Sequence, residues 1–398
     1  MKLPPAAWQR REGMGALLNV LGAGEGETRF VGGCVRDTLL GLEVSDVDLA
    51  TRLPPQEVME RLKRARIKAV PTGLAHGTVT AIVAGAPVEV TTLRRDVATD
   101  GRRATIAYTD DWREDAARRD FTINALSTDP GTLAVFDYFG GEADLEARRV
   151  RFIGDPLTRI AEDHLRILRF FRFHARFGFG APDAEGLAAC VARANDLMAL
   201  SRERIADELM KLLALPAPAA TVALMVEAGV LRPVLPEIEE AARLARLVAR
   251  EAEAGVEANA VRRLAALLPP DPEVAAAVAA RLRLSKKAAK RLTSAAVPDD
   301  GSPAPVLAYR LGSDEAVDRI LLGPRDPAKA RALAGWERPK LHVGGGDLIA
   351  MGLEAGPTVA NTLQRIEASW AEEGFPEDSE AQRAIARAAV DQALRERQ

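Results

Sequence analysis

Two aspartates that stand two positions apart, Asp46 and Asp48, follow a glycine-rich segment and form a pair that could bind metal ions. On one strand, the alternation of side chains would place both carboxylates on the same face. Oxygen ligands of this kind suit Mg²⁺, and two such ions can activate an attacking hydroxyl and neutralise a leaving pyrophosphate. The pair therefore predicts phosphoryl transfer with two magnesium ions. Solvated strand faces and turns show the same spacing and are the alternative.

The glycine-rich segment contains Gly32 and Gly33 directly after the apolar run 29–31. Glycines let backbone amides approach a triphosphate closely, and the first amides of a helix point toward phosphate oxygens. Arg36 would add a guanidinium donor to the same phosphates. The order of residues predicts a strand, a phosphate loop, a short helix and then a second strand over 45–49.

Glu89 is the candidate for a third carboxylate. It stands between two valines in the β-rich run 88–93, which follows another such run, 77–84. On a strand, Glu89 would point away from its apolar neighbours and toward the aspartate pair; a solvent-facing glutamate is the alternative. The polar segment 95–111 is expected to be a mobile loop.

Length and composition limit the class of protein. The 398 residues are enough for two to four domains, and beyond about residue 150 the Ala, Leu, Arg and Glu content with helical spacing predicts an α-rich region behind a mixed head. Two isolated cysteines, Cys34 and Cys190, form neither a disulfide framework nor a zinc cluster. No stretch approaches the roughly 18 apolar residues of a membrane span. We therefore expect a cytoplasmic protein that does not bind membranes.

A second motif, RRDFTINA, occupies residues 118–125. An arginine beside an aspartate can hold a triphosphate with one group and accept the hydrogen bond of a ribose hydroxyl with the other. A surface ion pair is the alternative. The sequence leaves open which of Arg118 and Arg119 would face the nucleotide.

A third motif lies in a helix predicted over 155–180, where Asp163 and Arg166 stand three positions apart. A carboxylate can accept from the exocyclic amino group of C or A while a guanidinium donates to the ring nitrogen. U and G present the opposite polarity and would leave both groups unpaired, at a cost of roughly 1–3 kcal/mol each. A salt bridge between Asp163 and Arg166 is the alternative.

Together these motifs resemble those of CCA-adding enzymes and bacterial poly(A) polymerases. The resemblance covers about residues 28–215 well and the carboxyl-terminal tail less specifically. It implies an α+β fold with a polymerase-beta-type nucleotidyltransferase head, a mixed sheet with helices, followed by all-α regions. The implied domains are the head (1–148), a neck that binds the nucleotide base and RNA (149–215), a helical body (216–340) and a tRNA-binding helical tail (341–398).

The activity implied by the resemblance is template-independent addition of CCA to the 3′ end of tRNA from CTP and ATP, with release of pyrophosphate. Mg²⁺ is the implied cofactor, and no obligate protein partner is inferred. Poly(A) or A-only addition by the same site is the alternative, and a noncatalytic RNA-binding protein is a third hypothesis. Segment 61–77 lacks the Arg-Arg-Phe signature associated with poly(A) polymerases, so CCA addition is preferred.

The resemblance also assigns roles to individual residues. Asp46, Asp48 and Glu89 would be catalytic, the two aspartates as metal ligands, and Asp120 would favour ribonucleotides. The implied nucleotide-binding residues are Gly32, Gly33, Arg36, Arg119, Asp120, Asn124, Asp163, Arg166, Arg169 and Arg172. A basic tract, 281–291, predicts RNA contacts from Lys286, Lys287 and Lys290, with a solvated helix face as the alternative.

Overall fold

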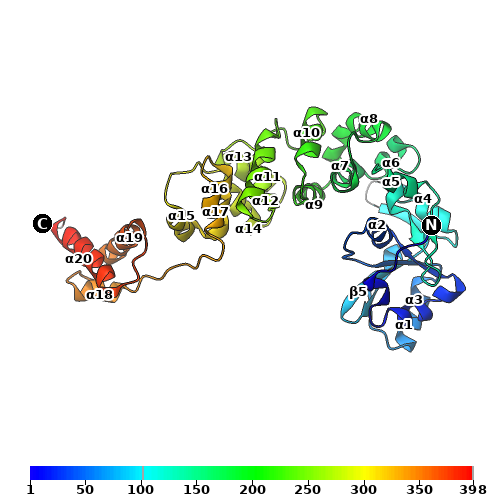
Figure 1. Cartoon of the computed structure of the whole chain (residues 1–398), viewed down its shortest axis with the longest axis horizontal. Coiled ribbons are helices and arrows are strands. Elements are labelled where there is room, and N and C mark those ends of the chain that lie inside the picture. Colours follow the sequence, from blue (N-terminus) through cyan, green and yellow to red (C-terminus); the bar gives the residue numbers. More distant parts are fainter. Residues whose placement is uncertain (101–102, 397–398) are drawn as a thin grey trace. The chain divides into compact units, whose positions relative to one another are not determined.

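A computed structural model describes residues 1–100 and 103–396 of the chain, which divides into two compact units, Met1–Pro236 and Glu237–Gln398. The amino-terminal part of the first unit combines strands and helices, and the regular elements that follow it among the described residues are helices (Figure 1). This arrangement confirms the expected α+β head with a helical remainder. The domain borders expected at 148, 215 and 340 stay predictions.

A seven-stranded mixed sheet forms the centre of the head, in the order β3-β4-β5-β2-β1-β8-β9. Strand β2 is antiparallel to β1 and parallel to β5, so the two runs that carry the candidate carboxylates are neighbours. The strands are β1 (Thr28–Val31), β2 (Asp48–Thr51), β3 (Ala69–Gly73), β4 (Thr78–Val83), β5 (Ala86–Thr92), β8 (Ser127–Thr128) and β9 (Val135–Phe136).

Helices cover the sheet and then continue alone through the first unit. Helix α3 is an example of the amphipathic pattern that lets a helix cover the sheet. It starts at Pro55 and buries Val58 and Leu62, while its charged residues face solvent. The helices are α1 (Met14–Val20), α2 (Gly33–Leu39), α3 (Pro55–Arg64), α4 (Trp112–Ala117), α5 (Gly141–Glu146), α6 (Pro156–Glu162), α7 (Arg166–Phe177), α8 (Ala184–Ala192), α9 (Arg202–Leu213) and α10 (Ala219–Glu227).

The structure corrects two expectations from the sequence. The segment 95–111 is not a loop throughout, because β6 (Arg94–Asp100) and β7 (Arg103–Tyr108) pair as an antiparallel ribbon. The helix predicted over 155–180 is interrupted at Asp163, whose backbone is extended (φ −153°, ψ 105°). Its carboxylate accepts the amide of Leu165 at 3.2 Å, a local turn that competes with helical hydrogen bonding.

The second unit is helical among its described residues. A buried ionic cluster joins three of its helices: Arg262 and Arg263 donate to Glu251, and Arg262 also contacts Asp318. The helices are α11 (Ala242–Ala254), α12 (Ala260–Leu267), α13 (Pro272–Arg281), α14 (Lys286–Ala295), α15 (Ala304–Leu311), α16 (Ser313–Leu322), α17 (Ala328–Arg331), α18 (Gly345–Ala350), α19 (Pro357–Glu372) and α20 (Ser379–Arg395).

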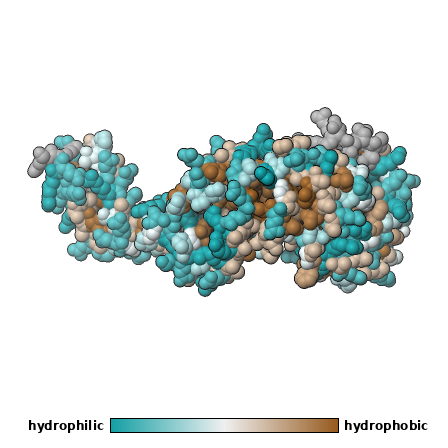
Figure 2. Space-filling model, turned by 90° about the horizontal axis from the view of Figure 1, so that it is seen from above, coloured by the Kyte–Doolittle hydropathy of each residue, from teal (hydrophilic) through white to brown (hydrophobic). Residues whose placement is uncertain are grey.

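Most of the face seen in Figure 2 is hydrophilic, with hydrophobic patches between the polar residues. The exposed large apolar side chains include Leu157, Phe179 and Met198. None of the helices formed by the described residues has the length and apolar character needed to cross a membrane.

A turn at Asp137 places the start of α5 against the 118–125 motif. The carboxylate of Asp137 accepts four backbone amides, from Phe139 to Glu142, at 2.9–3.1 Å. Helix α5, which begins at Gly141, packs so closely against the 118–125 motif that a Cβ atom at Gly141 would lie 2.4 Å from the carbonyl oxygen of Thr122. Glycine is therefore required here for backbone contact.

We predict that Gly141→Ala destabilises the protein by about 1–3 kcal/mol, because the backbone of one element must move to relieve the overlap. Thermal or urea unfolding measures the change. Gly15→Ala is the matched control, since a Cβ atom at Gly15 meets no atom within 4 Å and alanine is the better helix former. Equal stability of the two variants would contradict the packing argument.

Candidate active site

Two candidate carboxylates are neighbours across β2 and β5, and the third precedes β2 in the chain. Asp48 begins β2, and the parallel register pairs it with Glu89 of β5. Glu89 is exposed between the buried Val88 and Val90, so it lies on the face opposite its apolar neighbours, as predicted. Asp46 precedes the strand instead of lying on it, because β2 begins at Asp48 and not at residue 45.

Among the described residues, no positively charged side chain is in direct contact with the carboxylate of Asp48. Burial raises its pKa from 3.8 to about 6, and the negative charges of Glu89 and Asp46 act in the same direction, while Arg119 acts against them. No hydrogen bond from a described residue reaches the side chain of Asp48 or Glu89; Asp46 accepts only from Ser45, at 2.8 Å. The region around the start of β2 therefore carries negative charge that the described residues leave largely uncompensated.

This donor set fits the chemistry of a magnesium site, because closely placed carboxylates that repel one another gain most from a divalent cation. The fit lies in residue type, strand register and charge. The described side chains form no group of three or more His, Cys, Asp or Glu placed so that they could hold a metal ion. The metal role of Asp46 and Asp48 and the catalytic role of Glu89 therefore stay predictions.

The turn from β1 into α2 lies beside an arginine. Gly32 has φ 70° and ψ −123°, which a side chain would strain, and a Cβ atom there would lie 2.9 Å from Nη1 of Arg119. Gly33 opens α2, so the first amides of the helix are free of helical partners. The predicted order of strand, glycine turn, helix and strand is confirmed.

Arg119, and not Arg118, lies toward this turn. The guanidinium of Arg119 donates to the carbonyl of Asn124 at 3.3 Å and contacts Asp115 at 3.4 Å, and its charge acts on Asp48. Arg118 donates to Asp115 at 2.8 Å. Arg119 is thus next to the glycine turn and acts electrostatically on Asp48, while nucleotide binding by Arg119 stays a prediction.

Arg36 is placed differently from the expectation for a phosphate donor. It is 6% exposed, donates through Nε to Asp37 at 2.7 Å and through Nη1 to Asn124, and stacks over the ring of Phe177. Burial lowers its pKa, and the charge of Asp37 opposes that shift. The structure thus places Arg36 as a link between α2 and the 118–125 motif, and phosphate binding by Arg36 stays a prediction.

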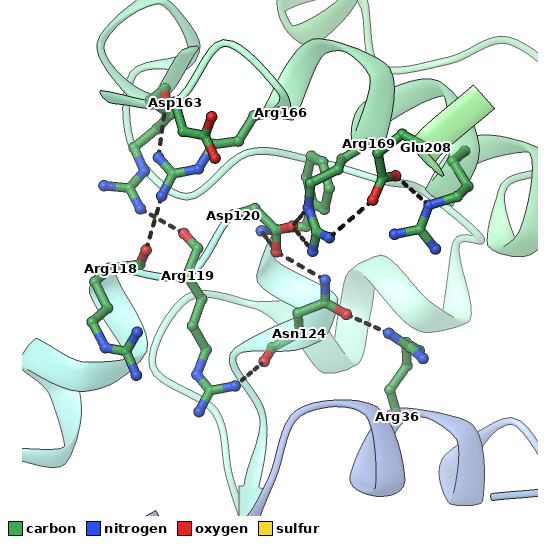
Figure 3. A network of polar contacts seen from close by, with 12 residues as sticks. Arg36, Arg118, Arg119, Asp120, Asn124, Asp163, Arg166, Arg169 and Glu208 are labelled. Atoms are coloured by element: carbon green, nitrogen blue, oxygen red, sulfur yellow. Dashed lines mark hydrogen bonds and ion pairs between the residues drawn. The ribbon is translucent and has the colours of Figure 1, made fainter. Parts of the chain in front are cut away.

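A chain of polar contacts runs from Arg36 to the helices that follow the head (Figure 3). Asn124 accepts from Arg36 and donates to Asp120 at 2.9 Å. Asp120 in turn accepts from Nε and Nη2 of Arg169 in α7, at 2.8 and 2.5 Å. The chain ends at Glu208 of α9, which lies 3.7 Å from Arg169. One continuous network therefore connects α2, the 118–125 motif, α7 and α9.

Asp120 has all its acceptor positions filled. Oδ1 accepts from Asn124 and from the amide of Phe121, and Oδ2 accepts twice from Arg169. Burial would raise the pKa of Asp120, but the charge of Arg169 and these hydrogen bonds outweigh burial and lower it. An ionised carboxylate offers about four lone-pair positions. A ribose hydroxyl can therefore donate to Asp120 only when one of the present donors moves.

Glu208 is a site residue that the motif analysis missed. It is 4% exposed and accepts from Nε of Arg172 at 2.6 Å while facing Arg169. The arginines at positions 169 and 172 are therefore held by one buried acid. Its helical position between Arg204 and Lys211 was visible in the sequence, but its burial against α7 was not.

Asp163 and Arg166 do not form the salt bridge that was the alternative to base recognition. Asp163 accepts from Arg204 of α9 at 2.7 Å. Arg166 donates to Glu162 and to the carbonyls of Arg159 and Arg118, the last two at 2.8 and 3.1 Å. Each member of the pair is thus held by other partners, and base recognition by the pair stays a prediction.

The basic tract 281–291 is not one continuous cationic face. Its ends are paired, Arg281 with Glu237 at 2.5 Å and Arg291 with Asp318 at 2.6 Å. The middle of the tract lies on α14, where three lysines are exposed and one of them contacts Glu315 at 3.4 Å. These are Lys286, Lys287 and Lys290, whose RNA contacts stay predictions.

We predict that Asp48→Asn stabilises the metal-free protein at pH 8 by about 3 kcal/mol, since its pKa is raised from 3.8 to about 6 and one pKa unit corresponds to about 1.4 kcal/mol. A raised carboxyl pKa means that the folded state disfavours the charge. The unfavourable contribution therefore appears as the pH rises from 3.8 through about 6 and is absent below that range. Urea unfolding in a chelator at pH 8 and pH 4 measures the difference.

The control for this prediction is Asp46→Asn. Because Asp46 is exposed, its charge is less desolvated, and its neutralisation removes a smaller energetic cost. A gain from Asp48→Asn that is the same at pH 4 and pH 8 would show that the effect is not electrostatic.

Comparisons with known proteins show the family to which the chain belongs. The family described as the poly A polymerase head domain matches residues 28–151, and the family described as a probable RNA and SrmB-binding site of polymerase A matches residues 182–242. The mitochondrial CCA tRNA nucleotidyltransferase 1 of Mus musculus is 34% identical over 401 residues, which cover 94% of this chain and 90% of that protein.

A bacterial relative and a solved structure extend the similarity. The CCA-adding enzyme of Levilactobacillus brevis is 32% identical over 369 residues, covering 86% of this chain and 88% of that protein. The crystal structure of the Bacillus stearothermophilus CCA-adding enzyme in complex with CTP has a TM-score of 0.74 and 26% identity, and it covers 98% of this chain and 99% of that one. The chain therefore belongs to the family of CCA-adding enzymes and poly(A) polymerases.

Proposed function

We propose that this protein is a nucleotidyltransferase that adds CCA to the 3′ end of tRNA, using CTP and ATP and releasing pyrophosphate. The observation that supports it is the meeting of three elements in the head: the aligned carboxylates Asp48 and Glu89, the Gly32 turn, and the guanidinium of Arg119. Relatives that match this chain along most of their length are named for this activity.

The triphosphate of the incoming nucleotide would lie between the glycine turn and the carboxylates. The free amides at the start of α2 and the guanidinium of Arg119 offer donors to phosphate oxygens. Asp46 and Asp48 would hold Mg²⁺, which supplies positive charge between the carboxylates and the phosphates and thereby favours attack of the RNA 3′-hydroxyl on the α-phosphate. Without a cation the carboxylates would repel the nucleotide.

Asp163 and Arg166 would recognise the base. The Nη1 and Nη2 groups of Arg166 donate to Glu162 and to two carbonyl oxygens, and its Nε hydrogen has no partner among the described residues. Asp163 keeps acceptor capacity beyond its contacts with Arg204 and Leu165. A donor and an acceptor side by side match the edges of C and A, because both bases present an amino group beside an unprotonated ring nitrogen.

Asp120 would act on the ribose through its network. Its four acceptor positions are occupied, so contact with a ribose hydroxyl requires Arg169 or Asn124 to give way. The 2′-hydroxyl of a ribonucleotide can replace the lost hydrogen bond to Asp120, whereas a deoxyribonucleotide has no such hydroxyl. Arg169 and Arg172 would keep this network in place through Glu208.

The reaction is tested with Mg²⁺ and a tRNA that lacks its last three nucleotides, supplied with each ribonucleotide singly and together. We expect addition of C with CTP alone, and of C, C and A followed by a stop when ATP is added. A long A tail would identify a poly(A) polymerase, and a single A an A-adding enzyme. Sizing the product on a gel distinguishes these outcomes.

Asp46→Ala is expected to abolish incorporation and to leave tRNA binding intact, because it removes a proposed metal ligand and no predicted RNA contact. Glu43→Ala is the control, an exposed acid three residues earlier. A wild-type protein that binds tRNA but incorporates nothing under any of these conditions would establish the noncatalytic hypothesis instead.

We predict that Asp163→Ala lowers the preference for CTP and ATP over UTP and GTP by about tenfold or more, with little effect on tRNA affinity, because wrong bases no longer leave a carboxylate unpaired. Competition assays with labelled nucleotides measure the preference. The control is Asp155→Ala, which removes the cap of α6 without touching the proposed base contacts. Unchanged preference in Asp163→Ala would show that base recognition lies elsewhere.

A further inference from the structure

One buried acid serves both arginines of the 118–125 motif. Asp115 lies on α4 and is 3% exposed. Its Oδ1 atom accepts from Nε of Arg118 at 2.8 Å, and its Oδ2 atom accepts from Nη2 of Arg119 at 3.4 Å. Oδ1 also accepts the backbone amide of Arg94 at 3.3 Å. We call the side chains of Asp115, Arg118 and Arg119 the shared-acid cluster.

Helix α4 holds the acid of this cluster in place. Trp112, three residues before Asp115, is 6% exposed and packs with Val31 of β1 and Ala50 of β2. The guanidinium of Arg29, also on β1, stacks over the ring of Trp112 with its carbon 4.2 Å from the ring centroid. Asp115 therefore cannot follow a moving arginine unless the whole helix shifts on the sheet. The acid is the fixed member of the cluster, and the two long arginine side chains are the adjustable members.

The two arginines share this acid unequally. Hydrogen bonds between a guanidinium and a carboxylate are normally about 2.7–2.9 Å long. The contact of Arg118 lies in that range, whereas the contact of Arg119 is 0.6 Å longer than that of Arg118. The other contact of Arg119, with the carbonyl of Asn124, is also long, at 3.3 Å (Figure 3). Arg118 is thus held by one short bond, and Arg119 by two weak ones.

One positive charge is left over in the cluster, and it faces the glycine turn. Burial would raise the pKa of Asp115, but the charges of Arg119 and Arg118 and the hydrogen bond from Arg118 lower it, so the acid is ionised at neutral pH. Arg119 is the arginine that approaches Gly32, and its charge lowers the pKa of Asp48. The excess charge therefore lies where an anionic group would meet it.

This division of charge depends on Arg118. A guanidinium that forms two short hydrogen bonds with a carboxylate has fewer donors and less net charge to offer a phosphate. If the charge of Arg118 were removed, Asp115 would keep one buried negative charge and one remaining arginine. A buried carboxylate is stable only when it is paired, so Asp115 would then draw Arg119 toward itself.

We propose that Asp115 and Arg118 are positioning residues for the triphosphate: Arg118 saturates the charge of Asp115 and thereby keeps Arg119 available to phosphate oxygens. The proposal rests on the proposed function, because it takes the triphosphate of the incoming nucleotide as the anion that Arg119 meets. Asp115 and Arg118 act only through Arg119 and do not touch the nucleotide. The second arginine of the motif therefore binds phosphate, and the first prevents its capture by the acid behind it.

The test compares three variants, Arg118→Gln, Asp115→Asn and the two together, by equilibrium dialysis of labelled CTP in the presence of Mg²⁺. Arg118→Gln should bind CTP about tenfold more weakly, because Arg119 turns to the unsaturated acid. Asp115→Asn should not bind more weakly than the wild type. The double variant should return to within about threefold of the wild type, because neither the acid nor its need for a partner remains. Arg113→Gln, which removes an exposed arginine of the same helix, is the control.

The double variant distinguishes this proposal from its alternatives. If Arg118 itself contacted the phosphates, the double variant would bind as weakly as Arg118→Gln, and the proposal would be overturned. Unchanged CTP binding in Arg118→Gln would overturn it as well. Tripolyphosphate, used as a competitor, should show the same order of affinities as CTP, because the effect concerns phosphates and not the base.

Two more readouts separate charge division from a structural defect and from failure of the proposed function. The preference for CTP over UTP should be the same in all variants, and a lowered preference in the double variant would show a distorted site and overturn the proposal. A wild type that binds CTP and shows the expected order among its variants, but adds no nucleotide to tRNA, would support the shared-acid cluster and refute the proposed function. A wild type that does not bind CTP would overturn both.

Discussion

A buried carboxylate with four donors, Asp120, is the interaction on which the arrangement of the first unit depends. Its donors come from its own motif and from α7, and through Asn124 it also reaches Arg36 of α2. A buried charge is tolerated only when it is paired and hydrogen-bonded, and removal of one partner from such a pair typically costs about 3–5 kcal/mol. The glycine turn and helix α7, which carries one member of the proposed base-recognition pair, are therefore held in one geometry by the same group.

The electrostatic design of the site depends on a contrast between balanced and unbalanced charge. In the Asp120 network every acid has an arginine within reach, and the network ends in Glu208, which holds two of them. Across β2 and β5, Asp48 and Glu89 have no such partner among the described residues, and the pKa of Asp48 rises to about 6 through burial and neighbouring negative charge. Charges that are paired and fixed thus lie around a small region whose negative charge an incoming cation would neutralise.

The buried charges of the second unit are balanced in the same way as those of the Asp120 network. Its buried acids, Glu251 and Asp318, are each held by arginines, which balances the interior. In the first unit, by comparison, negative charge that the described residues leave largely uncompensated marks the proposed metal site.

The sequence by itself determined the class of fold, the order of strand, glycine turn, helix and strand, and the alternation that exposes Glu89. These features depend on residue type and local spacing, which can be read directly from the sequence. Only the tertiary structure decided that Asp48 is beside Glu89, that Arg119 and not Arg118 approaches Gly32, and that Asp163 pairs with Arg204. It also showed the interruption of the predicted helix at Asp163 and the burial of Glu208. The reason is that strand order, helix packing and burial set these contacts between residues far apart in the chain, and local spacing alone does not fix which partners meet.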